Sequence, residues 1–203
     1  MRKYLLLLLA LLYGFVNSVY AQTLFLREEG GKYGYIDAQG KAVVPFVYDF
    51  AYTDEFSDSI AFVVCMVADN HVKIKAINRK NERLFTVFMF DNGPDYVNEG
   101  VFRIIDDSTG LMGFGNMAGD IAIKPQFFFV TPFSDGFASF NEGGKIVVFD
   151  ESDRHSFIDG GKWGFIDIWG NIVFPAIFDS ASVFDGGKAK VTIGDNVFSI
   201  KKK

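Results

Sequence analysis

Apolar and polar side chains alternate along residues 32–37, where Tyr33 and Tyr35 fall on the same side of an extended chain. A period of two residues is typical of a β-strand. The residues that follow are turn formers, because Asp37 can bond its own backbone and Gly40 can take a positive φ. The pattern therefore predicts a strand that ends in a tight turn.

A return strand and a third strand complete the first unit. Residues 41–44 are apolar enough to pair back onto the first strand, and Pro45 is expected to end this segment, because proline has no amide hydrogen for the ladder. A second polar turn at residues 54–58 precedes an apolar run at residues 60–64, the third strand. One unit is thus a hairpin, a proline-led connector and another strand.

The unit is repeated along the chain. Its opening, GKYGYID, returns as GKWGFID at residues 161–167 and in a worn form as GLMGFGN at residues 110–116. Repeats of this length indicate units that bury their apolar faces only against their neighbours. We predict four units, at about residues 31–64, 72–106, 110–141 and 161–192, with half-unit caps at residues 23–27 and 194–200.

Ten glycines, aspartates and prolines carry the repeated motif in the three clearer units. They are Gly34, Asp37, Gly40, Pro45, Gly113, Pro125, Gly164, Asp167, Gly170 and Pro175. The second unit has lost the signature glycine and the proline but has kept the alternation. We assign a structural role to the motif, with the glycine allowing close approach of a neighbouring strand.

The fold class expected from these units is all-β, because no segment shows sustained helical periodicity. Tandem hairpin units predict a curved, solenoid-like stack. Units of about forty residues also suit a small propeller or barrel, so a closed ring is the alternative.

The K-[WY]-G-[FY]-I-D opening, the glycine turn and the I/V-V-x-P strand resemble the WG-repeat family of bacterial exported proteins. The likeness is close in the first and last units and covers most of residues 31–200. It implies β-rich repeats that mediate interactions, with no enzymatic activity and no catalytic residues to transfer.

The first 21 residues resemble a signal peptide. Arg2 and Lys3 precede an apolar run at residues 4–16, and small residues before Gln22 suit a signal peptidase. We therefore expect residues 22–203 to form the mature domain in the periplasm, on the cell surface or outside the cell, with no membrane segment after cleavage. An uncleaved anchor is the alternative, although the run is short for a spanning helix.

Composition narrows the class of partner. The formal net charge of −5 gives no electrostatic attraction to nucleic acid. The single cysteine, Cys65, cannot form an internal disulfide and is expected to be buried in an apolar strand. Stability must come from packing, for which the 24 phenylalanines are the obvious means.

Three aromatic residues are the candidate ligand contacts. Tyr33 and Trp163 precede the signature glycines and are expected to supply buried area, with sugar stacking as the alternative. Trp169 lies in a turn, where we expect it to fold back onto its own unit, and ligand contact is again the alternative.

Polar segments offer weaker candidates. An insertion at residues 141–160 contains an extra strand-like run at residues 144–149, followed by a polar stretch with Asp150 and His155. The spacing in this stretch fits neither a calcium loop nor a zinc site, so we expect a solvated loop. The recurring acidic turns at Asp58, Asp135 and Asp185 are expected to stabilise their own turns. No cofactor, metal or catalytic residue is predicted.

These observations favour an exported, non-catalytic module that binds an unknown protein partner. The alternative is recognition of carbohydrate or cell wall through Trp169, Trp163 and Tyr33. A hydrolase that uses His155 is the weakest hypothesis.

Overall fold

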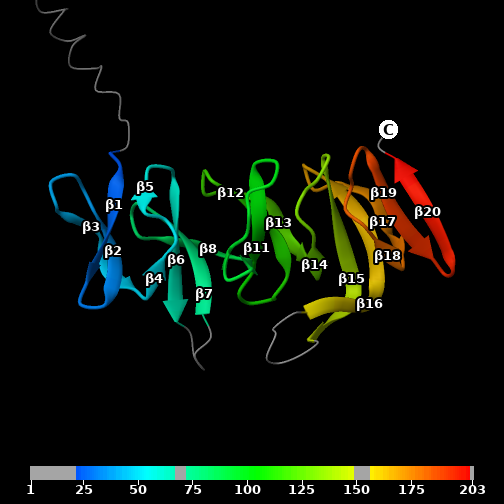
Figure 1. Cartoon of the computed structure of the whole chain (residues 1–203), viewed down its shortest axis with the longest axis horizontal. Helices are drawn as coiled ribbons and strands as arrows, with labels where there is room; N and C mark the ends of the chain where they lie inside the picture. Colours follow the sequence, from blue (N-terminus) through cyan, green and yellow to red (C-terminus); the bar gives the residue numbers. More distant parts are fainter. Residues whose placement is uncertain (1–21, 67–71, 149–155, 202–203) are drawn as a thin grey trace, which may run out of the picture.

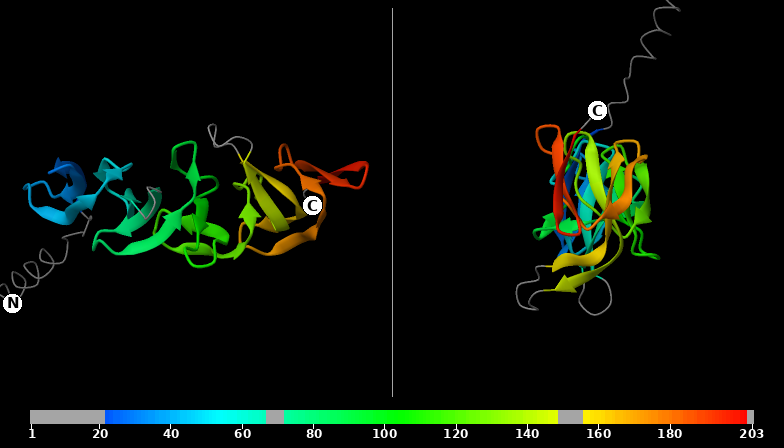
Figure 2. Two further views of the ribbon diagram at one scale, coloured as in Figure 1. Left: turned by 90° about the horizontal axis from the view of Figure 1, so that it is seen from below. Right: turned by 90° about the vertical axis from the view of Figure 1, so that its right-hand side faces the viewer.

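The computed structural model describes residues 22–66, 72–148 and 156–201, and in this part of the chain it contains twenty strands and no helix. The strands form an elongated row of small antiparallel sheets (Figure 1). The first and last strands lie at opposite ends of the row in Figures 1 and 2. The all-β prediction and the open stack are confirmed, and the closed ring is wrong.

The strands follow the four sequence units in order. The first unit holds β2 (Lys32–Ile36), β3 (Ala42–Tyr48), β4 (Phe50–Ala51), β5 (Glu55–Phe56) and β6 (Ile60–Met66). The second holds β7 (Val72–Asn78), β8 (Arg83–Val87), β9 (Met89–Phe90), β10 (Gly93–Pro94) and β11 (Val101–Ile105). The third holds β12 (Met112–Asn116), β13 (Ile121–Phe127), β14 (Phe129–Val130) and β15 (Phe137–Val148). The fourth holds β16 (Ser156–Asp167), β17 (Ile172–Phe178), β18 (Ser180–Ala181) and β19 (Lys188–Ile193). They lie between β1 (Leu24–Glu29) and β20 (Asn196–Lys201).

Strand pairing crosses each boundary between neighbouring units, and the largest sheet, with seven strands, contains strands of the first, second and third units. The closing strand of one unit pairs with the opening strand of the next, as in β6–β7, β11–β12, β15–β16 and β19–β20. The first strand, β1, pairs with β2 in the same way. A unit therefore cannot separate from its neighbour without losing a β-ladder, which interlocks the row.

The prolines lie inside the return strands and do not end them. In the first unit, Tyr33 pairs with Tyr48 and Tyr35 pairs with Val44, so β3 carries two extra residues between these pairs. The prediction that Pro45 ends the strand was wrong, because a bulged residue needs no ladder hydrogen bond. The same shift occurs opposite the signature glycines of the third and fourth units.

The second unit shows why glycine and proline were lost together. Its glycine position is taken by Lys75, which pairs with Thr86 on a return strand that has no bulge at this point. A side chain at this position and a bulge opposite it cannot share the same space. In the second unit β7 and β8 still pair, because the glycine and the bulge with its proline are both absent.

The core is a series of aromatic and aliphatic clusters that cross unit boundaries. One cluster joins Val101 of the second unit, Phe114 and Phe140 of the third and Ile166 of the fourth. Cys65 is buried in the first cluster, as predicted, and burial raises the pKa of its thiol. The phenylalanines therefore join the units as well as filling them.

The insertion after the third unit lengthens two existing strands. Residues 144–148 continue β15, which pairs with β16 through to Val148 and Ser156, so the run expected there is not a separate strand. The stretch with Asp150 and His155, like the signal segment at residues 1–21, lies outside the described residues.

Candidate functional site

The most distinctive exposed feature is a row of five aromatic side chains across the first and second units. We call it the aromatic row: Tyr33, Phe50, Tyr52, Phe90 and Tyr96. Ring centroids are 5.7 Å apart for Tyr33 and Phe50, 5.1 Å for Phe50 and Tyr52, and 5.9 Å for Phe90 and Tyr96. All three pairs meet edge to face, the arrangement that aromatic rings favour.

The second unit contributes to the row through a small hairpin that the other units lack. Strands β9 and β10 pair with each other, whereas β4, β14 and β18 pair with the closing strand of their own unit. The hairpin turns at Asp91 and Asn92, whose φ values of 47° and 67° suit a two-residue turn of type I′. The hydroxyl of Tyr52 donates to the carbonyl of Asn92 at 2.6 Å, which joins the two halves of the row.

Four of the five rings of the row are exposed to solvent, and Tyr33 is half-buried. Phe50 is 44% exposed, Phe90 48% and Tyr96 65%, and Met89 and Val97, which adjoin Phe90 and Tyr96 in the sequence, are also exposed. Aromatic and methionine side chains are enriched at the centres of protein interfaces. This composition suits contact with another molecule better than contact with water.

A buried ion pair between Asp95 and Arg103 anchors the β9–β10 hairpin to strand β11. The guanidinium of Arg103 donates to both carboxylate oxygens of Asp95, at 2.9 and 2.6 Å, and both side chains are almost fully buried. The guanidinium also lies over the rings of Phe88 and Phe90, at 4.2 and 5.7 Å from their centroids. Because these two charges are opposite and paired inside the protein, they add no net charge to the aromatic row.

The ion pair is added to a hydrogen bond that all four units share. Asp95 accepts from the backbone amide of Arg103, as Thr53, Thr131 and Ser182 accept from the amides of the corresponding strand residues. A carboxylate offers a further oxygen that a hydroxyl lacks, and the guanidinium uses it. The worn second unit has therefore acquired its own anchor.

The two tryptophans lie apart from this row. Trp163 is half-buried on β16 and packs edge to face against Phe129 at 6.1 Å, in line with its expected packing role. Trp169 is 79% exposed, so the expectation that it folds back onto its own unit was wrong. Its neighbour Ile168 takes the inward position and packs against the core of the preceding unit, which directs the indole outward.

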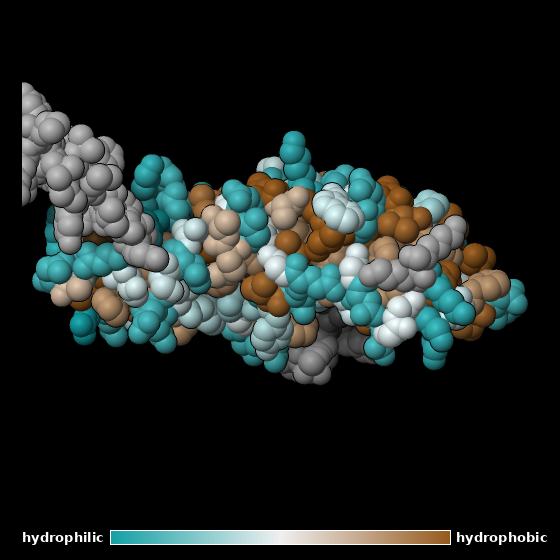
Figure 3. Space-filling model, turned by 90° about the horizontal axis from the view of Figure 1, so that it is seen from above, coloured by the Kyte–Doolittle hydropathy of each residue, from teal (hydrophilic) through white to brown (hydrophobic). Residues whose placement is uncertain are grey.

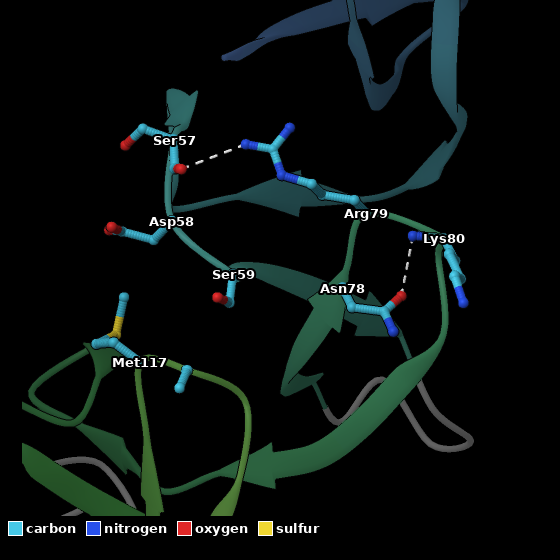
Figure 4. A pocket seen from close by; sticks show the side chains of 8 residues that line it. Ser57, Asp58, Ser59, Asn78, Arg79, Lys80 and Met117 are labelled. Atoms are coloured by element: carbon cyan, nitrogen blue, oxygen red, sulfur yellow. Dashed lines mark hydrogen bonds between the residues drawn. The ribbon is translucent and has the colours of Figure 1, made fainter. Parts of the chain in front are cut away.

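A shallow depression between the first and third units is the other candidate (Figure 4). Its lining combines one acidic turn and two hairpin turns: Ser57, Asp58, Ser59, Asn78, Arg79, Lys80, Met117 and Ala118. Arg79 has a structural task here, because its guanidinium donates to the carbonyls of Gln22 at 2.6 Å and Phe56 at 2.7 Å. What remains for a ligand is an open, shallow surface.

The acidic turns link successive units. The carboxylate of Glu99 accepts from the backbone amide of Gly136 in the next unit, and that of Asp135 accepts from the amide of Gly187 in the one after. We call this series the turn ladder. The expected role of Asp135 is to stabilise its own turn, and no spacing in the sequence indicates its bond to the next unit. The hairpin aspartates Asp37 and Asp167 do accept from their own turns.

Among residues 22–66, 72–148 and 156–201, no three histidine, cysteine or acidic side chains lie close enough to hold a metal ion. No helix in the same part of the chain is long and apolar enough to span a membrane. Figure 3 shows one face of the array, where apolar patches interrupt the hydrophilic surface, chiefly over the middle and the C-terminal half.

Comparison with known proteins identifies the repeat. The family model of the WG containing repeat matches residues 33–65, 112–145 and 163–196. The second unit lies between the first two matches and is not itself matched. No curated protein and no solved structure matches the chain at a significant level.

Proposed function

Since this chain belongs to the WG-repeat family, we propose that it is an exported, non-catalytic module that binds a protein partner through the aromatic row. The observation that carries the proposal is the row itself. Four of its five neutral aromatic side chains are exposed, and two of these, Phe90 and Tyr96, stand on the unit that has diverged from the repeat. Side chains of this kind dominate binding energy when a partner buries them.

The row also has the rigidity that a binding site needs. Tyr33, Phe50 and Phe90 lie on strands β2, β4 and β9, and Tyr52 directly follows β4. The buried pair of Arg103 and Asp95 holds the β9–β10 hairpin in place. A preorganised surface loses little conformational entropy on binding. Full burial of one such ring stabilises a complex by about 1.5–3 kcal/mol.

Affinity capture from the organism's own cell envelope tests the proposal. The wild-type chain, a Phe90→Ser/Tyr96→Ser variant and a Trp169→Ser control are immobilised, and captured proteins are identified by mass spectrometry. Binding of the purified partner is then measured by calorimetry. We expect the row variant to bind at least about tenfold more weakly and the control to match the wild type.

Two other outcomes would replace this proposal. Equal binding by the row variant and the wild type would exclude the row as the contact surface. Saturable quenching of tryptophan fluorescence by glycans or peptidoglycan fragments, lost in Trp169→Ala, would favour carbohydrate recognition instead.

Export is tested separately. Cell fractionation and N-terminal sequencing should find a protein that begins at Gln22 outside the cytoplasm. A protein that keeps residues 1–21 in the membrane fraction would support the uncleaved anchor. Neither result depends on the aromatic row.

A further inference from the structure

The last strand, β20, occupies the position of an opening strand. It pairs with the closing strand β19 as β16 pairs with β15. In the fourth unit the other edge of the opening strand is covered by the return strand β17. In the C-terminal sheet β20 is the outermost of the three described strands, so no described strand covers this edge.

Register places Phe198 at the signature glycine position. The bridges of the acidic turns mark equivalent residues, since Ser134 pairs with Phe137 and Asp185 pairs with Lys188. Three residues after each bridge, Phe140 pairs with Gly164 in one unit and Val191 pairs with Phe198 in the other. A phenylalanine therefore stands where the other well-matched units have glycine.

A side chain at this position is incompatible with a bulged return strand. A Cβ added to Gly164 would lie 2.5 Å from the carbonyl oxygen of Phe174, and one added to Gly34 would lie 2.7 Å from that of Val44. Backbone atoms cannot withdraw as the end of a flexible side chain can. The bulge with its proline needs glycine opposite.

The second unit shows which strand a side chain does accept. Lys75 holds the glycine position on β7, and β8 pairs with it directly through Thr86. At this point β8 is straight and contains no proline. A straight strand therefore fits where a bulged one does not.

We infer that Phe198 closes the edge of β20 to a further bulged repeat and leaves it as a pairing site for a straight, extended strand of a partner protein. Strand addition at an exposed edge is an established mode of recognition. The closing pair of the β19–β20 hairpin is Ile193 and Asn196, whose backbone groups bond to each other. Along an antiparallel strand the amides face alternate sides, so the amides of Val197 and Ser199 face away from β19 toward the edge.

Exposed lysines in the C-terminal sheet favour an acidic partner strand at this site. Lys188 pairs with Lys201, and Lys190 on the same face of β19 pairs with Ser199. All three lysines are exposed. Opposite charges on facing strands stabilise a sheet, so acidic residues on this face of the incoming strand are favoured.

Grafted strands test the inference within the chain. Residues 201–203 are replaced by a copy of residues 37–48, which gives a bulged return strand, or of residues 78–87, which gives a straight one. Each graft is made in three backgrounds: the wild-type chain with Phe198, the Phe198→Ala variant and the Phe198→Gly variant. Hydrogen exchange of the amides of Val197 and Ser199 reports pairing, and the amides of β16 report whether the fourth unit remains folded.

We expect the straight graft to slow exchange at Val197 and Ser199 at least tenfold with Phe198 present. The bulged graft should do so only after Phe198→Gly and not after Phe198→Ala, because the methyl group alone causes the clash. Equal protection by the bulged graft with Phe198 or Ala would overturn the exclusion. No protection by the straight graft would overturn the pairing site.

Discussion

The carbonyl of Pro45 folds directly over Gly34 on the neighbouring strand. A Cβ added to Gly34 would lie 2.8 Å from both the carbonyl carbon and the carbonyl oxygen of Pro45. The signature glycine and the bulge that carries the proline are thus two halves of one contact, although eleven positions separate Gly34 from Pro45 in the sequence. This explains why the second unit lacks both.

Gly34→Ala should therefore destabilise the protein. Overpacking a site with rigid walls costs about 1–3 kcal/mol, and we expect the upper part of this range because the clash is with backbone. The matched control is Gly93→Ala, whose nearest neighbour, the ring of Tyr52, would lie 3.9 Å from the new methyl group. Urea unfolding should show a change within about 0.5 kcal/mol for the control. Equal losses in both variants would contradict the contact.

The repeat and its all-β class could be predicted from the sequence because they rest on local patterns. Alternation, turn aspartates such as Asp37 and signature glycines such as Gly34 act on neighbouring residues. Pro45 was misread because a local rule, that proline ends a strand, ignores a bulge that forms only when the opposite strand has glycine.

The candidate surface could not be predicted from the sequence, because it depends on contacts between residues that are far apart along the chain. Tyr52 and Phe90 are brought together by a hydrogen bond to Asn92 and by the register of a hairpin unique to the second unit. The turn ladder likewise joins Glu99 to a glycine 37 residues away. Neither relationship has a spacing that a sequence pattern would reveal.

The turn ladder should stabilise the junction between units. Glu99 accepts from the amide of Gly136 at 2.9 Å, and Glu99→Ala removes this acceptor. We expect exchange of the Gly136 amide to accelerate about fivefold, in keeping with the loss of roughly 1 kcal/mol for one exposed hydrogen bond. The control is Glu99→Gln, which keeps an acceptor oxygen and should show the smaller change. The idea fails if both variants leave the Gly136 amide as protected as in the wild type.

Acid should weaken the second unit through Asp107. Burial disfavours the ionised carboxylate, but hydrogen bonds from Lys73, Lys75 and Thr86 outweigh this effect and hold the pKa of Asp107 well below its usual value. A folded-state pKa below the unfolded value of about 3.9 stabilises the protein above that pH. This contribution is lost as the pH falls toward the folded-state pKa.

The comparison of wild type with Asp107→Asn measures this contribution. The difference in the free energy of unfolding should be constant from pH 7 to about 5 and should shrink below about pH 4. Lys75→Met removes one of the donors, so the pH-dependent part should be smaller in that background. A difference that grows on acidification would contradict the assignment.

The buried pair of Asp95 and Arg103 offers the sharpest test of how the second unit diverged. Asp95→Thr restores the residue type found at Thr131 of the third unit but leaves the guanidinium buried without its carboxylate. Breaking such a pair by removing one partner costs about 3–5 kcal/mol. Adding Arg103→Ser, which reproduces Ser139 opposite Thr131, should recover stability relative to Asp95→Thr alone. Urea unfolding of the two single variants and the double variant measures the coupling between the residues. Purely additive losses would mean that the two substitutions act independently and that the ion pair is not what anchors the β9–β10 hairpin.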